Sequence, residues 1–181
     1  DSHWVATKAA GGIAYFLYDT PPSIQRYDMA TQQWIAPILL NPAPTALHVD
    51  TDGIYIAYGP QIRHRALDGS GETVLSDTST DLHEIIATDQ WLIARGGPKF
   101  WSNAGGSTLW IIDKLTGAVL DSTSAYGDMR KISVAHDQQR IFGWVVPRPA
   151  ASGPRDIVYQ GYDASGIFNE DKGSSPYTSY D

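Results

Sequence analysis

The chain has 181 residues, of which 18% are charged and 11% are aromatic, and its formal net charge is -7. A negative chain with no cluster of Lys and Arg is unsuited to a nucleic-acid backbone, because such binding depends on concentrated positive charge. The absence of cysteine excludes disulfides and thiolate metal sites but leaves the compartment open. No stretch approaches the roughly 18 apolar residues of a membrane span.

Two kinds of turn alternate along the chain. In one kind a hydrophobic residue precedes Asp, at Tyr27-Asp28, Leu67-Asp68, Ile112-Asp113 and Tyr162-Asp163. The other kind occurs at Gly11-Gly12, Asp52-Gly53, Asp89-Gln90 and Asp137-Gln138. Alternating hairpin turns without a helical signal predict consecutive four-stranded antiparallel meanders.

The predicted strands fall into four units of four. Those of the first two units are Trp4–Lys8, Ile13–Tyr18, Ile24–Tyr27 and Gln33–Leu39, then Thr45–Asp50, Ile54–Tyr58, Ile62–Leu67 and Glu72–Leu75. Those of the last two are Leu82–Thr88, Trp91–Ala94, Thr108–Ile112 and Ala118–Asp121, then Lys131–His136, Arg140–Val145, Asp156–Tyr162 and Ile167–Asn169. The second strand of each unit is almost continuously apolar, which is typical of strands buried on both faces.

The spacing of the units predicts the fold class. The turn residues Asp28, Asp68, Asp113 and Asp163 are 40, 45 and 50 positions apart. Four strands in about 40–50 residues indicate an all-β propeller with about four antiparallel blades. We expect one domain over 1–181, with blades near 3–40, 45–77, 82–122 and 131–170 and a tail at 171–181. Insertions at Gly96–Gly106 and Pro147–Pro154 separate the second and third strands, so both are expected on one face.

Four blades leave the ring open to two interpretations. Propellers close with four to eight blades, and closure removes exposed sheet edges. The stretch Ser174–Asp181 reads as a loop that runs toward another blade, so we expect part of a larger propeller, completed by a missing segment or a second chain. A compact four-bladed ring is the alternative.

The first residue, Asp1, is not Met, which predicts a processed or excised chain.

The repeat resembles known propeller families. In the first unit Gly11-Gly12-Ile13, Tyr27-Asp28, Thr31 and Trp34 resemble a kelch repeat. In the third unit Asp113-Lys114-Leu115-Thr116-Gly117 is similar to the quinoprotein-like (YVTN or PQQ-type) blades of bacterial surface proteins, and Asp163-Ala164-Ser165-Gly166 is a looser version. This resemblance implies a secreted, periplasmic or cell-surface bacterial protein.

The insertion at Gly96–Gly106 is the first candidate binding site. Gly pairs at both ends allow sharp bends, and aromatic rings lie beside an amide and an ammonium group. Such a surface suits a sugar ring or an extended peptide. The candidate residues are Lys99, Phe100, Trp101 and Asn103; the alternative is that the aromatic rings cover a neighbouring blade.

A second candidate segment is the connection Ser122–Arg130, which we expect on the same face. Its candidate residues are Tyr126, Asp128 and Arg130. The loop Pro147–Arg155 adds Arg148 and Arg155 between prolines, which reduce the entropy lost on binding. Simple solvation of these charges is the alternative.

Metal and catalytic patterns are weak. Asp50-Thr51-Asp52-Gly53 resembles the start of a calcium loop but lacks a downstream Glu, and Asp-Gly is also a strong hairpin signal. The imidazoles of His48, His83 and His136 fall at comparable positions in three first strands, where zinc would need all three within about 2.1 Å. The four repeated Asp residues fit turn caps better than a catalytic set. We expect no metal and no cofactor.

These observations predict a non-catalytic module that binds carbohydrate or protein through loops on one propeller face. No nucleophile elbow, phosphate-binding loop or dinucleotide fingerprint is present in the sequence. Two alternatives stay open. One is part of a propeller enzyme, such as a quinoprotein dehydrogenase or a lactonase-like hydrolase, and the other is an architectural spacer in a long adhesin.

Overall fold

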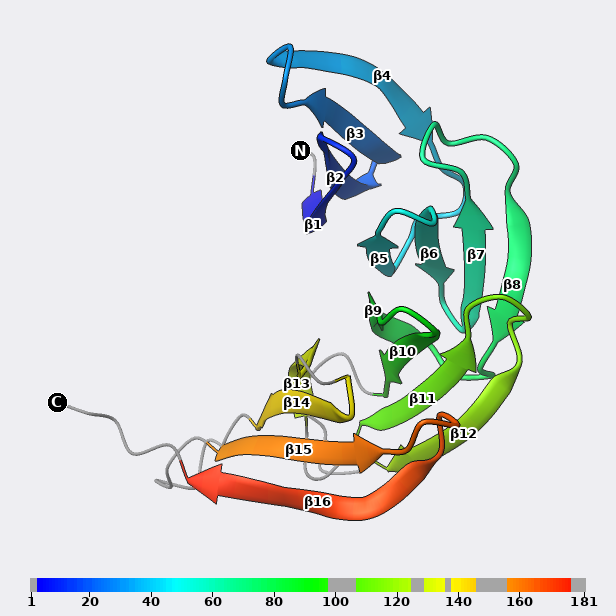
Figure 1. The fold of residues 1–181 in the computed structure, drawn as a ribbon. Coiled ribbons are helices and arrows are strands. Elements are labelled where there is room, and N and C mark those ends of the chain that lie inside the picture. The colour runs from blue at the N-terminus through cyan, green and yellow to red at the C-terminus, as the bar shows by residue number, and fades with distance from the viewer. Residues whose placement is uncertain (1–2, 98–106, 125–128, 136–137, 146–155, 177–181) are drawn as a thin grey trace, which may run out of the picture. The chain divides into compact units, whose positions relative to one another are not determined.

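The fold is all-β. The structure, a computed structural model, describes residues 3–97, 107–124, 129–135, 138–145 and 156–176. Within these ranges sixteen strands and no helix are found, so no helix there could cross a membrane. The strands form four antiparallel four-stranded sheets, each made of strands that are consecutive in the chain (Figure 1). The predicted all-β class and the four four-stranded repeats are confirmed.

The chain divides into two compact units, and the first comprises residues 1–87. Its strands are β1 His3–Ala10, β2 Ile13–Thr20, β3 Pro22–Asp28, β4 Gln33–Leu39, β5 Ala46–Val49, β6 Ile54–Tyr58, β7 Gln61–Arg65, β8 Thr73–Asp77 and β9 Leu82–Ala87. Strands β1–β4 form the first sheet and β5–β8 the second.

The core of the first unit lies between its two sheets. The first sheet contributes Tyr15, Leu17, Ile24 and Ile38, and the second sheet contributes Leu47, Val49, Ile54, Ile56 and Tyr58. Since side chains alternate between the faces of a strand, the side chains of Phe16 and Tyr18 point to the opposite face of the first sheet. Burial of this apolar area is the main force that holds the two sheets together.

The second unit comprises residues 88–181. Its strands are β10 Trp91–Gly96, β11 Thr108–Asp113, β12 Val119–Ser124, β13 Met129–Val134, β14 Arg140–Val145, β15 Asp156–Tyr162 and β16 Phe168–Pro176. The third sheet has the order β12-β11-β10-β9 and the fourth the order β13-β14-β15-β16. Fully buried side chains in this unit include Leu92, Ile93, Leu109 and Ile111.

Central and outer strands differ in burial as their sequences predict. All five residues of β6 are buried, and in β10 every residue after Trp91 is buried. The outer strand β4 is mostly exposed and contains Pro37, and an edge strand tolerates a residue without a backbone donor. The insertions predicted between second and third strands do lie between β10 and β11 and between β14 and β15.

The end of the chain departs from the prediction. We expected a strand only at 167–169 and a tail from 171, whereas β16 extends to Pro176 and pairs with β15 along its length. The segment is polar, so periodicity could not reveal it; backbone pairing with β15 holds it. Gly173 lies opposite Tyr159, and a Cβ there would be 3.0 Å from the Tyr159 hydroxyl. The glycine therefore leaves room for the aromatic ring.

The start of the fourth sheet also differs. The connection expected at Ser122–Arg130 is shorter, because β12 continues to Ser124 and β13 begins at Met129. Arg130 is therefore a strand residue and pairs with Trp144. The backbone pairing of Met129 with Val145 extends the strand beyond its apolar part.

Candidate functional site

Most of the predicted binding residues lie outside the part of the chain that the structure describes. Lys99, Phe100, Trp101, Asn103, Tyr126 and Asp128 lie outside the described residues, as do Arg148 and Arg155. Arg130 is placed by its backbone in β13. The proposed insertion site therefore stays a prediction.

The turns between the third and fourth strands are organised by their repeated Asp residues. Oδ1 of Asp113 accepts hydrogen bonds from the backbone N–H of Leu115 (3.0 Å) and Thr116 (2.7 Å) and from the Thr116 hydroxyl (2.8 Å). The other three carboxylates accept N–H groups two to four residues further on: Asp28, Asp68 and Asp163. The structural role predicted for the four residues is confirmed.

These hydrogen bonds favour the ionised carboxylates. The pKa of Asp28 and of Asp113 lies below its ordinary value, mainly because the N–H of the residue three positions on donates to the carboxylate. The pKa of Asp68 is lowered mainly by the hydroxyl of Ser70. A hydrogen bond to the charged form of an acid stabilises that form, so turn geometry accounts for these shifts.

The turns between the first and second strands have a cap of their own. In the second sheet Oδ1 of Asp50 accepts the N–H groups of Asp52 (2.8 Å) and Gly53 (3.3 Å). In the third sheet the Thr88 hydroxyl accepts the N–H groups of Gln90 (3.3 Å) and Trp91 (2.8 Å). Asp50 and Thr88 thus hold equivalent turns, and the hairpin interpretation of Asp50–Gly53 is confirmed.

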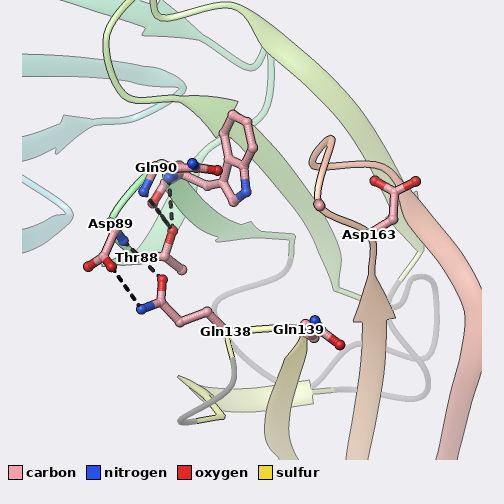
Figure 2. Close-up of a pocket in the computed structure, with 8 residues that line it drawn as sticks. Thr88, Asp89, Gln90, Gln138, Gln139 and Asp163 are labelled. Atoms are coloured by element: carbon pink, nitrogen blue, oxygen red, sulfur yellow. Dashed lines mark hydrogen bonds between the residues drawn. The ribbon is translucent and has the colours of Figure 1, made fainter.

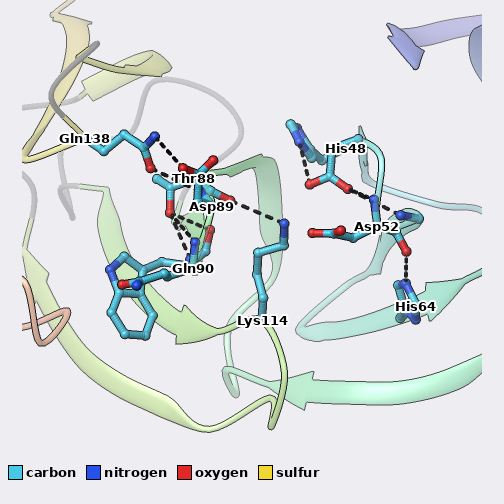
Figure 3. Close-up of polar contacts among 11 residues, drawn as sticks. His48, Asp52, His64, Thr88, Asp89, Gln90, Lys114 and Gln138 are labelled. Carbon is cyan, nitrogen blue, oxygen red and sulfur yellow. Dashed lines mark hydrogen bonds and ion pairs between the residues drawn. The ribbon is translucent and has the colours of Figure 1, made fainter. Parts of the chain in front are cut away.

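The histidines predicted as possible metal ligands occur in strands. His48 lies in β5 and His83 in β9, both half-buried, and His136 is outside the described residues. In the first unit Nε2 of His48 is 3.8 Å from a carboxylate oxygen of Asp50, and the His64 ring is 3.2 Å from the backbone oxygen of Asp52 (Figure 3). No group of three or more His, Asp or Glu residues suited to a metal ion is found in the described ranges.

A polar recess lies in the second unit, between three of its turns. Its lining is Thr88, Asp89, Gln90, Trp91, Gln138, Gln139, Asp163 and Ala164 (Figure 2). The turn before β10 supplies three of these residues and β10 itself supplies Trp91. The turn before β14 supplies two, and the Asp turn between β15 and β16 supplies the rest. We call this site the tip recess.

Two side chains fix the tip recess by a reciprocal pair of hydrogen bonds. The backbone N–H of Asp89 donates to Oε1 of Gln138 (3.1 Å), and Nε2 of Gln138 donates to Oδ2 of Asp89 (3.2 Å). Figure 2 shows these two bonds joining the turn before β10 to the turn before β14. The two turns are 49 residues apart in sequence, so the pair locks neighbouring sheets of the unit to each other.

Lys114 also stabilises the turn that contains Thr88. Nζ of Lys114 donates to the backbone oxygen of Thr88 (3.3 Å), and the Lys114 N–H donates to the backbone oxygen of Gln90 (3.1 Å). The first of these bonds is drawn in Figure 3. The walls of the tip recess are therefore held by backbone and side-chain hydrogen bonds.

Chemically, the tip recess combines amide, carboxylate and hydroxyl groups with one indole. These groups donate and accept hydrogen bonds without supplying a strong nucleophile. The sequence has Asp-Gln at both 89–90 and 137–138, and each pair predicts a turn. Nothing in this pattern marks a shared site, because only the fold brings Gln138 to Asp89.

Comparison with known proteins supports the fold. No protein-family model and no curated protein matches the chain. Among solved structures, hydrazine synthase from Kuenenia stuttgartiensis has a TM-score of 0.69 at 15% identity, over 92% of this chain and 51% of that chain. A functionally unknown protein from Desulfotomaculum acetoxidans has a TM-score of 0.68 at 12% identity, over 93% and 55%.

A designed protein is also similar. The computationally designed Ika4 protein has a TM-score of 0.60 at 14% identity, over 87% of this chain and 91% of that chain. The chain thus spans about half the length of the two natural proteins and nearly the full length of this designed one. At such identities the likeness concerns the fold alone, which is a propeller-like all-β repeat.

Proposed function

We propose that the chain is a non-catalytic recognition module, a β-propeller segment that binds carbohydrate. The tip recess is the observation that carries this proposal. Its amides, hydroxyl and carboxylates match the donors and acceptors of sugar hydroxyls, and the Trp91 indole adds the apolar surface that a sugar ring needs. Walls held by hydrogen bonds reduce the entropy lost on binding.

The insertion loop is a second, separate candidate for the binding surface. Phe100 and Trp101 would add stacking area beside Lys99 and Asn103, as the sequence predicts. This loop follows β10, whereas the tip recess includes the turn before β10, so the two surfaces belong to opposite ends of that strand. They are separate candidates, and one experiment can distinguish them.

The proposed module is a β-propeller in which further blades complete the ring. Four consecutive meander sheets and neighbours of about twice the length support a segment of a larger propeller. In the first unit Gly11 and Gly12 have positive φ values of 57° and 79°, and the Trp34 ring packs on Phe16 at 5.5 Å and on Tyr27 at 5.2 Å. These features support a kelch-like first blade. The quinoprotein-like character of the later blades and a secreted, periplasmic or cell-surface bacterial origin rest on the sequence resemblance alone.

A glycan array tests the recognition function. We expect the wild-type protein to bind a subset of glycans and Gln138→Asn to lose at least about tenfold in apparent affinity, because the shorter amide cannot reach Asp89. Asn tolerates the positive φ of 54° at this position, so the turn is preserved. Gln33→Asn, at an exposed site in β4, is the matched control and should bind as the wild type does.

Trp101→Ala reports on the insertion loop in the same array. Loss of binding in this variant alone would move the site from the tip recess to the insertion. Absence of glycan binding by the wild type would contradict the proposed function, and a protein ligand would then be sought.

A further inference from the structure

The first sheet has an apolar face on which some of the described side chains are strongly exposed. Phe16, Tyr18, Tyr27 and Trp34 lie on the side opposite to the buried Tyr15, Leu17 and Ile24, as the strand pairing and alternation require. Trp34 is 61% exposed, and Leu39 on the same face is 76% exposed. We call this set, Phe16, Tyr18, Tyr27, Trp34 and Leu39, the outer aromatic face.

The equivalent face of the second sheet is buried against a neighbouring sheet. Residue pairing aligns Ala14, Phe16 and Tyr18 of β2 with Ile54, Ile56 and Tyr58 of β6. In the second sheet these positions are buried against the first sheet, with Ile54 and Ile56 at 0% exposure. The outer aromatic face therefore occupies the position that, one repeat later, receives a neighbouring sheet.

The last sheet presents the complementary position. Its buried side includes Ile141 and Val158, whereas Phe142 and Tyr159 point to the other side and are half-buried. Their rings are 6.2 Å apart. By the same alignment Phe142 corresponds to Tyr55 of the second sheet, which is 2% exposed. An aromatic position that is closed in the second sheet is thus half open in the fourth.

We propose that the outer aromatic face of one copy of this chain packs against the Phe142–Tyr159 face of a second copy. This inference rests on the proposed propeller. A contact between two different faces is heterologous, and two such contacts related by a twofold axis close a ring. Two copies would supply eight sheets, within the range in which propellers close. They would also supply about the length of the natural neighbours, of which one copy spans 51% and 55%.

The chemistry of the two faces suits such a contact. Aromatic residues are enriched in interfaces because each ring buries a large area at a small cost in side-chain entropy. Outer strands with exposed Trp and Leu would otherwise be a liability for aggregation. Packing of one aromatic face on another removes both from water.

Measurement of mass in solution tests the proposal. Light scattering coupled to size-exclusion chromatography should give twice the mass of one chain for the wild type at micromolar concentrations. Trp34→Glu should raise the dimer dissociation constant about tenfold or more, because it places a charge in the contact. Val74→Glu is the matched control, because Val74 is 60% exposed in the outer strand β8 and lies outside both faces.

A second substitution protects the test against misfolding. Leu39→Glu changes the most exposed position of the outer aromatic face and should have the same effect as Trp34→Glu, with an unchanged far-ultraviolet spectrum. A monomeric wild type, open-ended assemblies, or a dimer that survives both substitutions would overturn the proposal. A monomer that still binds glycans refutes only the contact between copies, whereas a dimer that binds none refutes only the recognition function.

Discussion

At the residue scale, the turn carboxylates tie stability to pH. In the folded chain the pKa of Asp113 is lowered by hydrogen bonds, chiefly that from the Thr116 N–H. A folded-state pKa below the unfolded value stabilises the protein above about pH 4 and loses this effect as the pH falls through the folded value. Asp28 and Asp68 act in the same direction.

Asp113→Ala tests this coupling. We expect its melting temperature at pH 7 to fall by about 2–4 °C, as for loss of a capping side chain in a chain of this size. As the pH falls below 4 and through the lowered pKa of folded Asp113, the difference from the wild type should shrink, since the wild-type carboxylate becomes protonated. Circular dichroism melts between pH 2 and 7 measure both effects. Glu170→Ala, at an exposed site in β16, serves as the control, and a difference that does not depend on pH would contradict the explanation.

At the scale of elements, one turn shows how closely two sheets approach each other. Gly69, between β7 and β8, has a φ of 91°, and a Cβ there would lie 2.5 Å from Cγ1 of Ile38 in the first sheet. Gly71 in the same turn has a φ of 68° but no atom within 4 Å of such a Cβ. Both glycines adopt a left-handed backbone that would strain any other residue, but only Gly69 lacks space for a side chain.

Alanine at these two positions separates strain from packing. Gly71→Ala should cost about 1 kcal/mol, the usual penalty of a left-handed backbone for Ala. Gly69→Ala should cost roughly 1–3 kcal/mol more, because the added methyl group displaces Ile38 from the core. Urea unfolding of both variants measures the difference, and equal destabilisation would show that Ile38 yields without cost.

Much of the element order was predictable from turns and apolar runs. The repeated Asp turns fixed where the third and fourth strands meet, and the unbroken apolar run Ile54–Tyr58 identified a strand buried on both faces. Extension of β16 to Pro176 was not predictable, because Lys172, Gly173 and Ser174 carry no periodic signal. Their pairing depends on β15, which only the assembled sheet reveals.

The site was less predictable than the fold. The insertion was predicted as a binding site because Phe100 and Trp101 are aromatic residues in a loop. Asp89 and Gln138 look like ordinary turn residues, and their hydrogen bonds join turns 49 residues apart. A contact of this range follows from the packing of the third and fourth sheets and has no local signature. The sequence therefore predicts the turn that contains Gln138 but does not predict its hydrogen bonds to Asp89.

At the scale of the whole molecule, every sheet has two edge strands, and β4, β8, β12 and β16 are the edge strands that come last in the chain. Each pairs on one side only within the described part of the chain. Central strands such as β6 and β11 pair on both sides and are buried. Protection from solvent should therefore increase from the outer edge of each sheet toward its middle.

Hydrogen exchange measured by mass spectrometry tests this gradient. Peptides from β6 and β11 should exchange at least about tenfold more slowly than peptides from β4 and β8, because local opening of an edge strand breaks fewer bonds and exposes less apolar area. The gradient should persist if two copies associate, since the proposed contact covers sheet faces and leaves the outer edges free. Exchange of β4 as slow as that of β6 would show that its edge is paired with another strand. That pairing would favour edge-to-edge assembly over the face-to-face contact through Phe16 and Trp34.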